Sequence, residues 1–328
     1  MKIVLFQQHK FNLWNPPPEA VENLRQQFPE HEFVHPPTPE AWAKEIEDAE
    51  VAIGSFLPPK VLVTLPKLKW VHSTAAAVHQ YIVPEFVASP ILLTNGRTTF
   101  ASTVAEHVIA IMFALARQLP ASVRFQEKRA WGQQELFDAK PGVRQIRGAM
   151  LGLVGVGSIG EEVAKRAKAL GMKVIAVRHN VQKPLPVGID VVYGPTDLPT
   201  LLSQSDFVVL AAPVTVSTRH LIAAEQLSHM KRDAYLINVG RGALIDEVAL
   251  HNALKTKQIA GAGLDVFEEE PLPPTSPLWA LENLLITPHC GGFIANLWEL
   301  HVDLIARNLR RYLAGEPLVG LIDKSLGY

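Results

Sequence analysis

The residues with the clearest chemical meaning form the segment Gly155-Val156-Gly157-Ser158-Ile159-Gly160, in which three glycines follow the spacing GxGxxG. An apolar run at 151–154 precedes the segment, and a helical pattern at 161–170 follows it. In that setting the first glycine permits a tight turn, the second lets backbone approach a pyrophosphate, and the third lets the helix pack on the strand. The free N–H groups at the helix N-terminus can then hold phosphates. We therefore predict a dinucleotide site rather than an ordinary strand-to-helix turn.

The end of the next strand indicates which dinucleotide is bound. An NAD site normally carries an Asp or Glu there, about 20 residues further on, to hold the ribose diol. This chain has Arg178, which follows Gly160 by 18 residues, and no Asp or Glu stands between Val163 and Ile189. Arg178, with His179 and Lys183 beside it, suits a 2′-phosphate. We predict NADP(H) as the preferred cofactor, with NAD(H) possible, because Arg178 could also be a solvated side chain in an NAD site that lacks its carboxylate.

The elements that must position these residues alternate between strands and helices. Short apolar runs predict strands at 3–6, 51–54, 68–72, 91–94, 151–154, 174–177, 207–210, 235–238, 263–266 and 284–287. Helical spacing predicts long helices at 103–117 and 298–313, and the polar stretch 124–148 reads as a connection. This alternation is typical of an α/β fold with parallel sheets.

Composition limits the possible classes of protein. The length of 328 residues suggests about two domains of the usual size of roughly 100–200 residues. A formal net charge of -1 argues against a protein whose main task is binding nucleic acid or an anionic membrane. The single cysteine, Cys290, indicates a reduced compartment, and the N-terminus resembles no signal peptide, so we expect a cytoplasmic protein. The apolar run 108–116 is too short to span a bilayer, for which about 20 residues are needed, and we interpret it as a core helix.

Several segments together resemble the D-isomer-specific 2-hydroxyacid dehydrogenases. They are Thr103-Val104-Ala105-Glu106-His107, Ala211-Ala212-Pro213 with Thr218-Arg219-His220-Leu221-Ile222, Ile237-Asn238-Val239-Gly240-Arg241-Gly242, Asp265-Val266-Phe267-Glu268-Glu269-Glu270-Pro271 and Pro288-His289-Cys290-Gly291-Gly292. The resemblance covers most of the chain and is strongest between residues 96 and 292. It implies two Rossmann-like, doubly wound parallel-sheet domains with an active-site cleft between them. Residues 1–96 and 293–328 would form a discontinuous substrate domain, and 97–292 the dinucleotide-binding domain with the interdomain helix.

The resemblance also implies a catalytic set of Arg241, Glu270 and His289. A 2-oxo acid substrate needs an anchor for its carboxylate and polarisation of its carbonyl, which the permanent cation of Arg241 can supply. His289 can donate the proton, and Glu270 can hold and charge the imidazole. Each of them follows the carboxyl end of a predicted strand, where ligands bind in open α/β sheets. Taken individually, Arg241 could be a surface or capping arginine, Glu270 part of a solvated acidic run, and His289 a turn histidine. The choice of Glu270 over Glu268 or Glu269 rests on the resemblance.

Further contacts are implied by the same resemblance. Asp265 would hold the nicotinamide carboxamide, and the remaining cofactor contacts would be Thr103, Ala212, Pro213, Thr218, Val239, Gly240 and Gly291. The backbone amides of Ala75, Ala76 and Ala77 align with a loop that holds the substrate carboxylate, together with Arg241 and His289. Relatives usually have glycines in that loop, and alanine restricts φ there.

The function that follows is an NAD(P)-dependent 2-hydroxyacid dehydrogenase acting as a 2-oxoacid reductase. NADPH would be preferred, the substrate would belong to the glyoxylate or hydroxypyruvate class, and the protein would form a homodimer. The alternative is a dinucleotide-sensing binding protein that resembles the C-terminal-binding corepressors, which share the fold. We expect no metal, because the twelve histidines show no ligand spacing, and no thiol nucleophile at Cys290.

Overall fold

The chain consists of two compact units, each with its own parallel sheet. The computed structural model describes residues 1–55 and 57–327. Unit 1 combines Met1–Phe100 with Phe293–Tyr328, and unit 2 is Ala101–Gly292. The boundary that we placed after residue 96 thus falls after Phe100. In both units every strand pair is parallel, which is the α/β class expected from the alternating elements.

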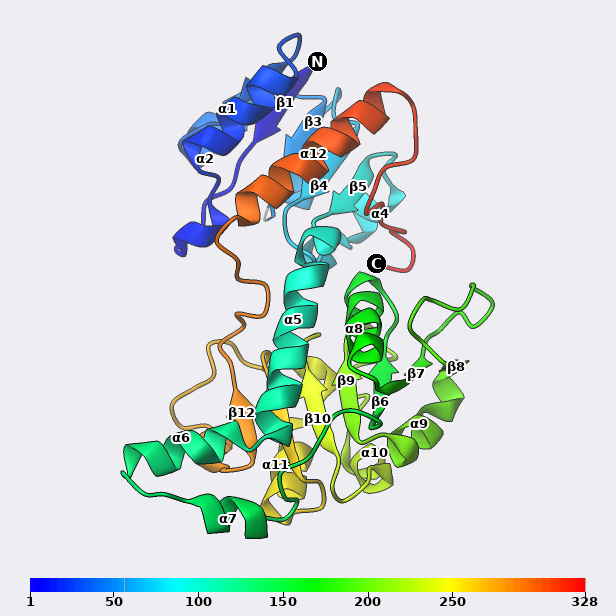
Figure 1. Ribbon diagram of the computed structural model, residues 1–328. Coiled ribbons are helices and arrows are strands. Elements are labelled where there is room, and N and C mark those ends of the chain that lie inside the picture. Colours follow the sequence, from blue (N-terminus) through cyan, green and yellow to red (C-terminus); the bar gives the residue numbers. More distant parts are fainter. Residues whose placement is uncertain (56, 328) are drawn as a thin grey trace. The chain divides into compact units, whose positions relative to one another are not determined.

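Unit 1 is built on a five-stranded sheet with the order β2-β1-β3-β4-β5 (Figure 1). Its strands are β1 (Lys2–Leu5), β2 (Glu32–Val34), β3 (Val51–Ile53), β4 (Trp70–Ser73) and β5 (Leu92–Asn95). Its helices are α1 (Pro18–Gln27), α2 (Pro39–Glu45), α3 (Pro59–Leu62), α4 (Pro84–Ala88) and α12 (Leu297–Leu313). Successive side chains of β1 enter different cores: Ile3 packs with α1 and α12, whereas Val4 packs with α2 and α3. Helices therefore cover both faces of this sheet.

Unit 2 is built on a seven-stranded sheet with the order β12-β11-β10-β9-β6-β7-β8 (Figure 1). The strands are β6 (Met150–Val154), β7 (Lys173–Val177), β8 (Val191–Tyr193), β9 (Phe207–Leu210), β10 (Tyr235–Asn238), β11 (Gly261–Leu264) and β12 (Leu284–Ile286). The helices are α5 (Arg97–Ala116), which begins in unit 1, α6 (Leu119–Glu127), α7 (Gln133–Asp138), α8 (Ser158–Ala169), α9 (Leu198–Gln204), α10 (Ala224–His229) and α11 (Glu247–Lys255). The strand order reverses beside β6, and ligands bind at such a switch point.

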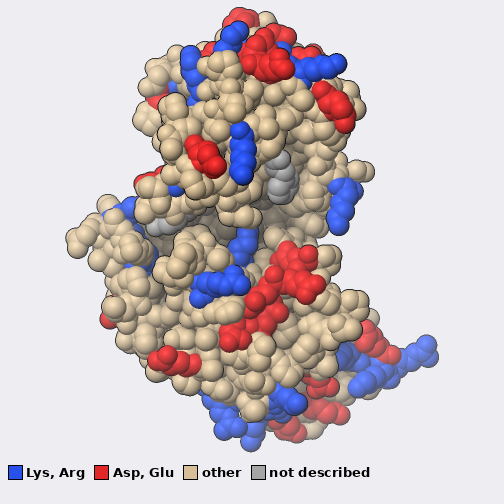
Figure 2. Space-filling view, turned by 180° about the vertical axis from the view of Figure 1, so that it is seen from behind, with Lys and Arg blue, Asp and Glu red and all other residues tan. Residues whose placement is uncertain are grey.

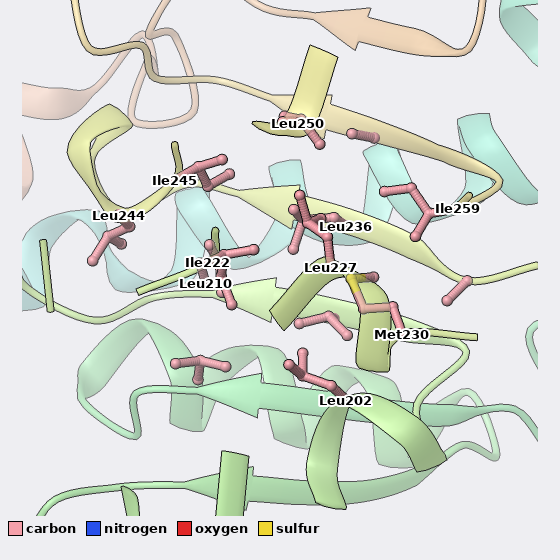
Figure 3. Packing of buried hydrophobic residues seen from close by; sticks show 14 of the residues in the cluster. Leu202, Leu210, Ile222, Leu227, Met230, Leu236, Leu244, Ile245, Leu250 and Ile259 are labelled. Atoms are coloured by element: carbon pink, nitrogen blue, oxygen red, sulfur yellow. The ribbon is translucent and has the colours of Figure 1, made fainter. Parts of the chain in front are cut away.

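One core cluster of unit 2 lies between the sheet and the helices α9, α10 and α11 (Figure 3). Leu210 on β9 and Leu236 on β10 pack there against Leu202, Leu227 and Leu250 of the three helices. All five side chains are fully buried. Burying a leucine is worth roughly 1.5–3 kcal/mol, so this layer holds the sheet rigid beneath the loops that follow its strands.

The strands that we expected from apolar runs are all present, with ends shifted by at most two residues. Two short edge strands, β2 and β8, are additional. The stretch 124–148, which we interpreted as a connection, holds the end of α6 and all of α7. Helix α5 is long and apolar enough to cross a membrane by length and composition alone, but 56% of that stretch is buried inside the protein.

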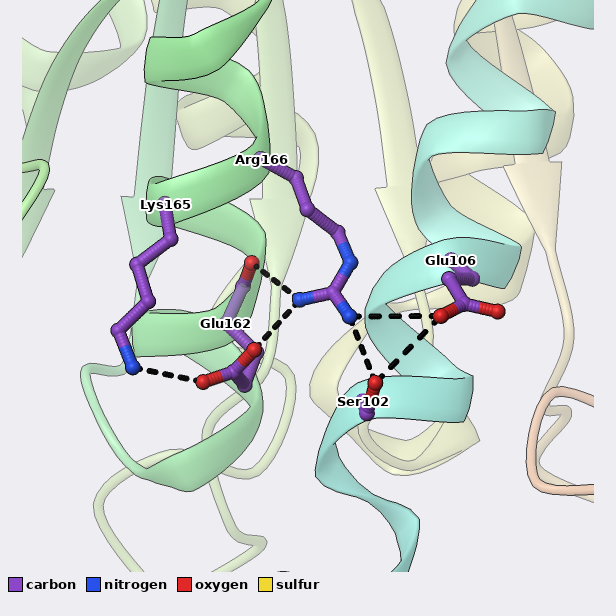
Figure 4. Close-up of polar contacts among 5 residues, drawn as sticks. All are labelled: Ser102, Glu106, Glu162, Lys165 and Arg166. Atoms are coloured by element: carbon purple, nitrogen blue, oxygen red, sulfur yellow. Dashed lines mark hydrogen bonds and ion pairs between the residues drawn. The ribbon is translucent and has the colours of Figure 1, made fainter.

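Helix α8 is fixed against helix α5 by charged groups of both helices (Figure 4). Arg166 on α8 donates to the hydroxyl of Ser102 at 2.6 Å and pairs with Glu106 at 3.4 Å. The same guanidinium pairs with Glu162 at 2.5 Å, and Glu162 also accepts from Lys165 at 2.7 Å. These groups are partly exposed, so we expect them to contribute little to the free energy of folding. Their main effect is to fix the orientation of α8 relative to α5.

Charged side chains of both signs are interspersed on the face shown in Figure 2. Basic and acidic groups lie next to one another on both units there, rather than in one continuous basic field. This distribution agrees with the balance of 31 Lys and Arg against 32 Asp and Glu.

Candidate active site

The glycine turn joins β6 to α8 in the way that a phosphate site requires. Gly155 has φ +97°, and a Cβ on it would lie 2.7 Å from the amide nitrogen of Ala212. A Cβ on Gly160 would lie 2.4 Å from the carbonyl oxygen of Gly155. Gly157 differs from both, because a Cβ there would meet nothing within 4 Å. The first and third glycines therefore serve the packing of the chain, and the second faces open space at the helix N-terminus.

That open space adjoins free hydrogen-bond donors. Helix α8 begins at Ser158, and its N-cap residue, Gly157, offers no side-chain acceptor. The first N–H groups of a helix have no intrahelical partner, and the helix dipole places partial positive charge on them. These residues fit the pyrophosphate of a dinucleotide, for which an exposed backbone and unpaired amides are needed.

Arg178 stands directly after β7, where an NAD site would carry its carboxylate. Its Nη2 donates to the carbonyl oxygens of Lys183 and Pro184, so the side chain is held by the loop that follows the strand. Its Nε is buried and finds no acceptor among the described residues. Within that part of the chain no carboxylate pairs with it, whereas His179 and Lys183 are exposed. A buried guanidinium nitrogen without an acceptor fits a phosphate oxygen better than a ribose diol.

The loops after β6, β9 and β10 meet at the carboxyl edge of the sheet. Ala212 abuts Gly155 through its amide nitrogen, and a Cβ on Gly240 would lie 3.0 Å from the carbonyl oxygen of Ala212. Thr218 donates to the carbonyl oxygen of Pro213 at 2.7 Å and so closes the β9 loop. Val239, which precedes Gly240, is buried. The structure thus brings together most of the expected cofactor contacts; Thr103, on α5, makes no side-chain hydrogen bond to them within the described residues.

Arg241 is held in a turn that Asn238 organises. The side chain of Asn238 accepts from the amide of Gly240 at 3.0 Å and donates to the carbonyl oxygen of Arg241 at 2.9 Å. A Cβ on Gly242 would lie 1.8 Å from the carbonyl carbon of Phe267, so glycine is needed for this loop to meet the one after β11. Burial lowers the pKa of Arg241, and the negative charge of Glu270 opposes that effect. The guanidinium stays charged, because arginine is not deprotonated in proteins.

Glu270 and His289 form a direct pair. His289 Nδ1 lies 2.6 Å from Glu270 Oε2, while Glu270 Oε1 accepts from the amide of Phe267 at 2.9 Å. Burial raises the pKa of Glu270, but the hydrogen bonds from His289 and Phe267 and the charges of His289 and Arg241 outweigh it and lower that pKa overall. An ionised Glu270 accepts the Nδ1 proton, which leaves Nε2 of His289 for exchange with a substrate. The His289 side chain is 48% exposed and thus accessible.

The neighbouring glutamate, Glu268, has a different partner. Its carboxylate lies 2.9 Å from His220 Nε2, and its amide donates to Glu247 at 2.7 Å. Burial, together with the charges of Glu268 and Glu270, raises the pKa of Glu247, although the amide of Glu268 lowers it. His220 and Glu247 hold this loop in place. His220 stands in one of the segments that resemble the family, where it had no assigned role, and nothing in the sequence singled out Glu247.

Asp265 lies at the end of β11 in a dense hydrogen-bond network. Oδ1 accepts from the hydroxyl of Thr287 at 2.6 Å and from the amide of Cys290 at 2.9 Å, and Oδ2 accepts from the amide of Gly291 at 2.9 Å. His107 Nε2 lies 3.4 Å from Oδ1. Burial raises the pKa of Asp265, but the hydrogen bonds from His107, Thr287, Gly291 and Cys290 lower it overall. His107 belongs to a motif noted in the sequence, where it had no assigned role, and Thr287 is the last residue of the strand predicted at 284–287.

The alanine loop lies in unit 1, after β4. The amide of Gly96 donates to the carbonyl oxygen of Ala75 at 3.1 Å, and the side chain of Asn95 donates to that of Ala76 at 2.5 Å. Ala75, Ala76 and Ala77 all have negative φ, so alanine adopts this loop without strain. These residues belong to a different unit from Arg241, Glu270 and His289.

Comparisons with known proteins agree with this arrangement. The family model described as "D-isomer specific 2-hydroxyacid dehydrogenase, NAD binding domain" matches residues 109–291. The chain is 34% identical to a glyoxylate reductase of Korarchaeum cryptofilum, over 89% of this chain and 88% of that protein. It is 35% identical to a glycerate dehydrogenase of Methylorubrum extorquens, over 90% and 92%.

A solved structure resembles the whole chain. The D-isomer-specific 2-hydroxyacid dehydrogenase of Xanthobacter autotrophicus, in complex with NADPH and MES, superposes with a TM-score of 0.83 at 28% identity and covers 99% of both chains. The proteins matched are dehydrogenases or reductases, so the present chain is an oxidoreductase that acts on 2-hydroxy acids or their 2-oxo counterparts with a nicotinamide cofactor. On the glycine turn, the Arg241–Glu270–His289 arrangement and these matches, the chain belongs to the D-isomer-specific 2-hydroxyacid dehydrogenase family.

Proposed function

We propose that this enzyme is an NADPH-preferring reductase of small 2-oxo acids of the glyoxylate or hydroxypyruvate class. The observation that carries the cofactor preference is Arg178 at the end of β7, with its buried Nε free of any acceptor in the described part of the chain. The similar dehydrogenase from Xanthobacter autotrophicus binds NADPH. The substrate class is supported by the similarity to a glyoxylate reductase and a glycerate dehydrogenase.

The residues of the site have distinct tasks in this proposal. The amides of Ser158 and Ile159 hold the pyrophosphate, and Arg178 holds the 2′-phosphate. The cofactor, when bound, supplies the hydride. Arg241 binds the substrate carboxylate and polarises the 2-oxo group, because a planar guanidinium can engage both. His289 delivers a proton from Nε2 to the oxygen that becomes the hydroxyl, while Glu270 holds Nδ1 and stabilises the charged imidazole. In the oxidative direction His289 takes the proton back.

The decisive experiment is a panel of 2-oxo acids tested with NADPH and with NADH. The expected result is loss of reduced-nicotinamide absorbance with glyoxylate or hydroxypyruvate and a higher kcat/KM with NADPH. Larger 2-oxo acids serve as the comparison for substrate size. Equal or better use of NADH would overturn the cofactor preference, and a larger preferred acid would overturn the substrate class. Binding of NADPH without turnover of any acid would favour a sensing role instead.

The proposal includes a homodimer held by the segment from α6 to α7. Several large apolar side chains are exposed there, among them Trp131 at 89% and Phe137 at 78% exposed. Exposed aromatic residues on neighbouring elements are typical of an interface, and a second copy of the chain is the partner that the family resemblance implies. Light scattering during gel filtration should give twice the chain mass, and Trp131→Ser with Phe137→Ser should halve it. A monomeric parent protein would refute this part.

A further inference from the structure

A cluster of three potential metal ligands lies beside the catalytic pair in unit 2. His107 comes from α5, Asp265 from the end of β11, and Cys290 from the loop after β12. Their ligand atoms all lie within 4.8 Å of one another. The three positions are far apart in the sequence, so no ligand spacing indicates them. Our expectation of no metal rested on the spacing of the histidines and on the presence of a single cysteine, which cannot form a site built from cysteines alone.

The distances in this cluster suit a small cation. His107 Nε2 and Asp265 Oδ1 are 3.4 Å apart. Tetrahedral zinc, with bonds of about 2.0–2.3 Å, separates neighbouring ligand atoms by about 3.3–3.7 Å. The separations from Cys290 are bounded only by 4.8 Å, so its sulfur must move closer by up to about 1 Å to complete the site.

The surroundings hold these groups in position. Thr287 links His107 to Asp265, because its hydroxyl lies 3.0 Å from His107 Nε2 and donates to Asp265 Oδ1 at 2.6 Å. A Cβ on Gly291 would lie 2.8 Å from Asp265 Oδ2 and 3.1 Å from His107 Cδ2, so glycine lets the backbone pass close to both. Asp265 is buried, whereas His107 and Cys290 are partly exposed and leave an approach from solvent.

The ligand types select the kind of cation. A thiolate, an imidazole and a carboxylate together favour zinc, whereas magnesium and calcium prefer oxygen ligands. Three protein ligands with one open position, filled by water, form the type of zinc site that can be reached from solution. Binding displaces the thiol proton of Cys290, as thiolate ligation requires. It also needs the lone pair of His107 Nε2, so the imidazole proton moves to Nδ1 and the hydrogen bond from Nε2 to Thr287 is given up.

We propose that His107, Asp265 and Cys290 bind one zinc ion, and that this ion competes with the nicotinamide cofactor. The first statement depends only on the cluster. The second rests on the proposed function and on the family resemblance, which implies that Asp265 holds the carboxamide of the nicotinamide. An ion held by Asp265 occupies the carboxylate that this contact uses.

The first statement is tested on cofactor-free protein with cobalt(II) as the probe. Cobalt bound to a thiolate shows charge-transfer absorption, and this absorption disappears when zinc displaces the cobalt. One ion per chain is expected in the parent and in a control variant, His229→Gln, which changes an exposed histidine of another helix. Cys290→Ser lacks the thiolate, so the charge-transfer band is absent whether or not an ion binds. Calorimetry therefore measures the zinc affinity of the variants. Cys290→Ser and His107→Gln should each weaken zinc by more than the roughly 10- to 100-fold that loss of an outer-shell partner costs. Unchanged zinc affinity in both variants, with the native circular dichroism spectrum, would overturn the site.

The second statement is tested by titrating NADPH at several fixed zinc concentrations. Competition raises the apparent Kd for NADPH in proportion to zinc in the parent, and the effect is absent in Cys290→Ser. An apparent Kd that does not respond to zinc, while zinc binding persists, overturns the competition. The cobalt measurement contains no cofactor, so failure of the proposed cofactor preference leaves its result unaffected.

Discussion

Gly157→Ala should weaken cofactor binding and leave the fold almost intact, because the position lies in open space. Gly157 has φ −105°, which any residue adopts. A Cβ there meets no atom within 4 Å, so the methyl group causes no clash. Alanine is a poorer N-cap residue than glycine, and we expect a loss of about 0.5–1 kcal/mol in the free energy of unfolding.

The other two glycines of the turn provide matched controls. Gly155→Ala combines φ +97° with a Cβ only 2.7 Å from the amide nitrogen of Ala212. The positive φ costs about 1–2 kcal/mol and the overpacking about 1–3 kcal/mol, so we expect a loss of roughly 2–5 kcal/mol. In Gly160→Ala only a clash is expected, because the new Cβ lies 2.4 Å from the carbonyl oxygen of Gly155. The free energy of unfolding should fall by about 1–3 kcal/mol.

The effect of Gly157→Ala on binding follows from the space that the methyl group takes. It stands at the N-terminus of α8, where the backbone must approach the pyrophosphate. We expect the binding of NADPH and of NADH to weaken equally, because both cofactors contain the pyrophosphate. The expected loss is about 10- to 100-fold in affinity, which corresponds to roughly 1.4–2.8 kcal/mol. Fluorescence titration measures the two dissociation constants, and urea denaturation measures the free energy of unfolding.

Two results would refute this reasoning. If Gly157→Ala is as unstable as Gly155→Ala, the position is not open space in the folded protein. If Gly157→Ala keeps the parent affinity for both cofactors, the pyrophosphate does not lie against this turn. A loss of stability of at most about 1 kcal/mol, together with weakened binding of both cofactors, is the outcome that the geometry predicts.

Three further predictions concern other sites. Arg178→Asp should weaken NADPH binding by about 10- to 100-fold, because it removes charged hydrogen bonds worth roughly 1.5–3 kcal/mol, and it should improve NADH binding. Unchanged dissociation constants for both cofactors would contradict the assignment. Glu270→Gln should lower kcat by about two orders of magnitude, with cofactor affinity retained, because the variant loses the negative charge that faces Nδ1 of His289. Glu268→Gln should keep most of the activity, and equal losses of the two variants in steady-state assays would contradict the distinction. The pKa of Asp206 is lowered from 3.8, because burial, which raises it, is outweighed by the Met150 amide and by Lys231 and Arg144. The contribution of ionised Asp206 to stability is therefore present above pH 3.8 and is lost as the pH falls through the lower pKa of the folded state. Urea denaturation should show that the difference in free energy of unfolding between the parent and Asp206→Asn shrinks toward zero in acid.

The sequence predicted the sheets well because buried parallel strands are continuous apolar runs. Runs such as Phe207-Val208-Val209-Leu210 are fully buried and admit little other interpretation. The edge strands β2 (Glu32–Val34) and β8 (Val191–Tyr193) were missed because each has three residues and an exposed first residue, which gives no clear pattern. Helices α6 and α7 were missed for a related reason, since they contain no buried residue.

Much of the site could be placed from the sequence because parallel topology brings strand ends together. Asn238 on β10 pairs with Leu264 on β11, and Leu264 pairs with Ile286 on β12. Residues that soon follow these three must lie at one edge of the sheet, which is where Arg241, Glu270 and His289 were expected. What spacing could not supply is the fold of each loop.

Loop conformation decides which of several equivalent side chains performs a task, and single hydrogen bonds decide the loop conformation. Glu268 and Glu270 are two residues apart in one acidic run, yet only Glu270 has a carboxylate that accepts from the Phe267 amide and meets His289. Glu268 meets His220 instead, a residue that follows a different strand. The same holds for Arg178, whose hydrogen bonds to the carbonyl oxygens of Lys183 and Pro184 leave Nε buried beside the end of β7. The chemistry of this site therefore depends on partners that the chain brings from distant segments, and exchanging one partner should redirect a side chain without changing the sheet beneath it.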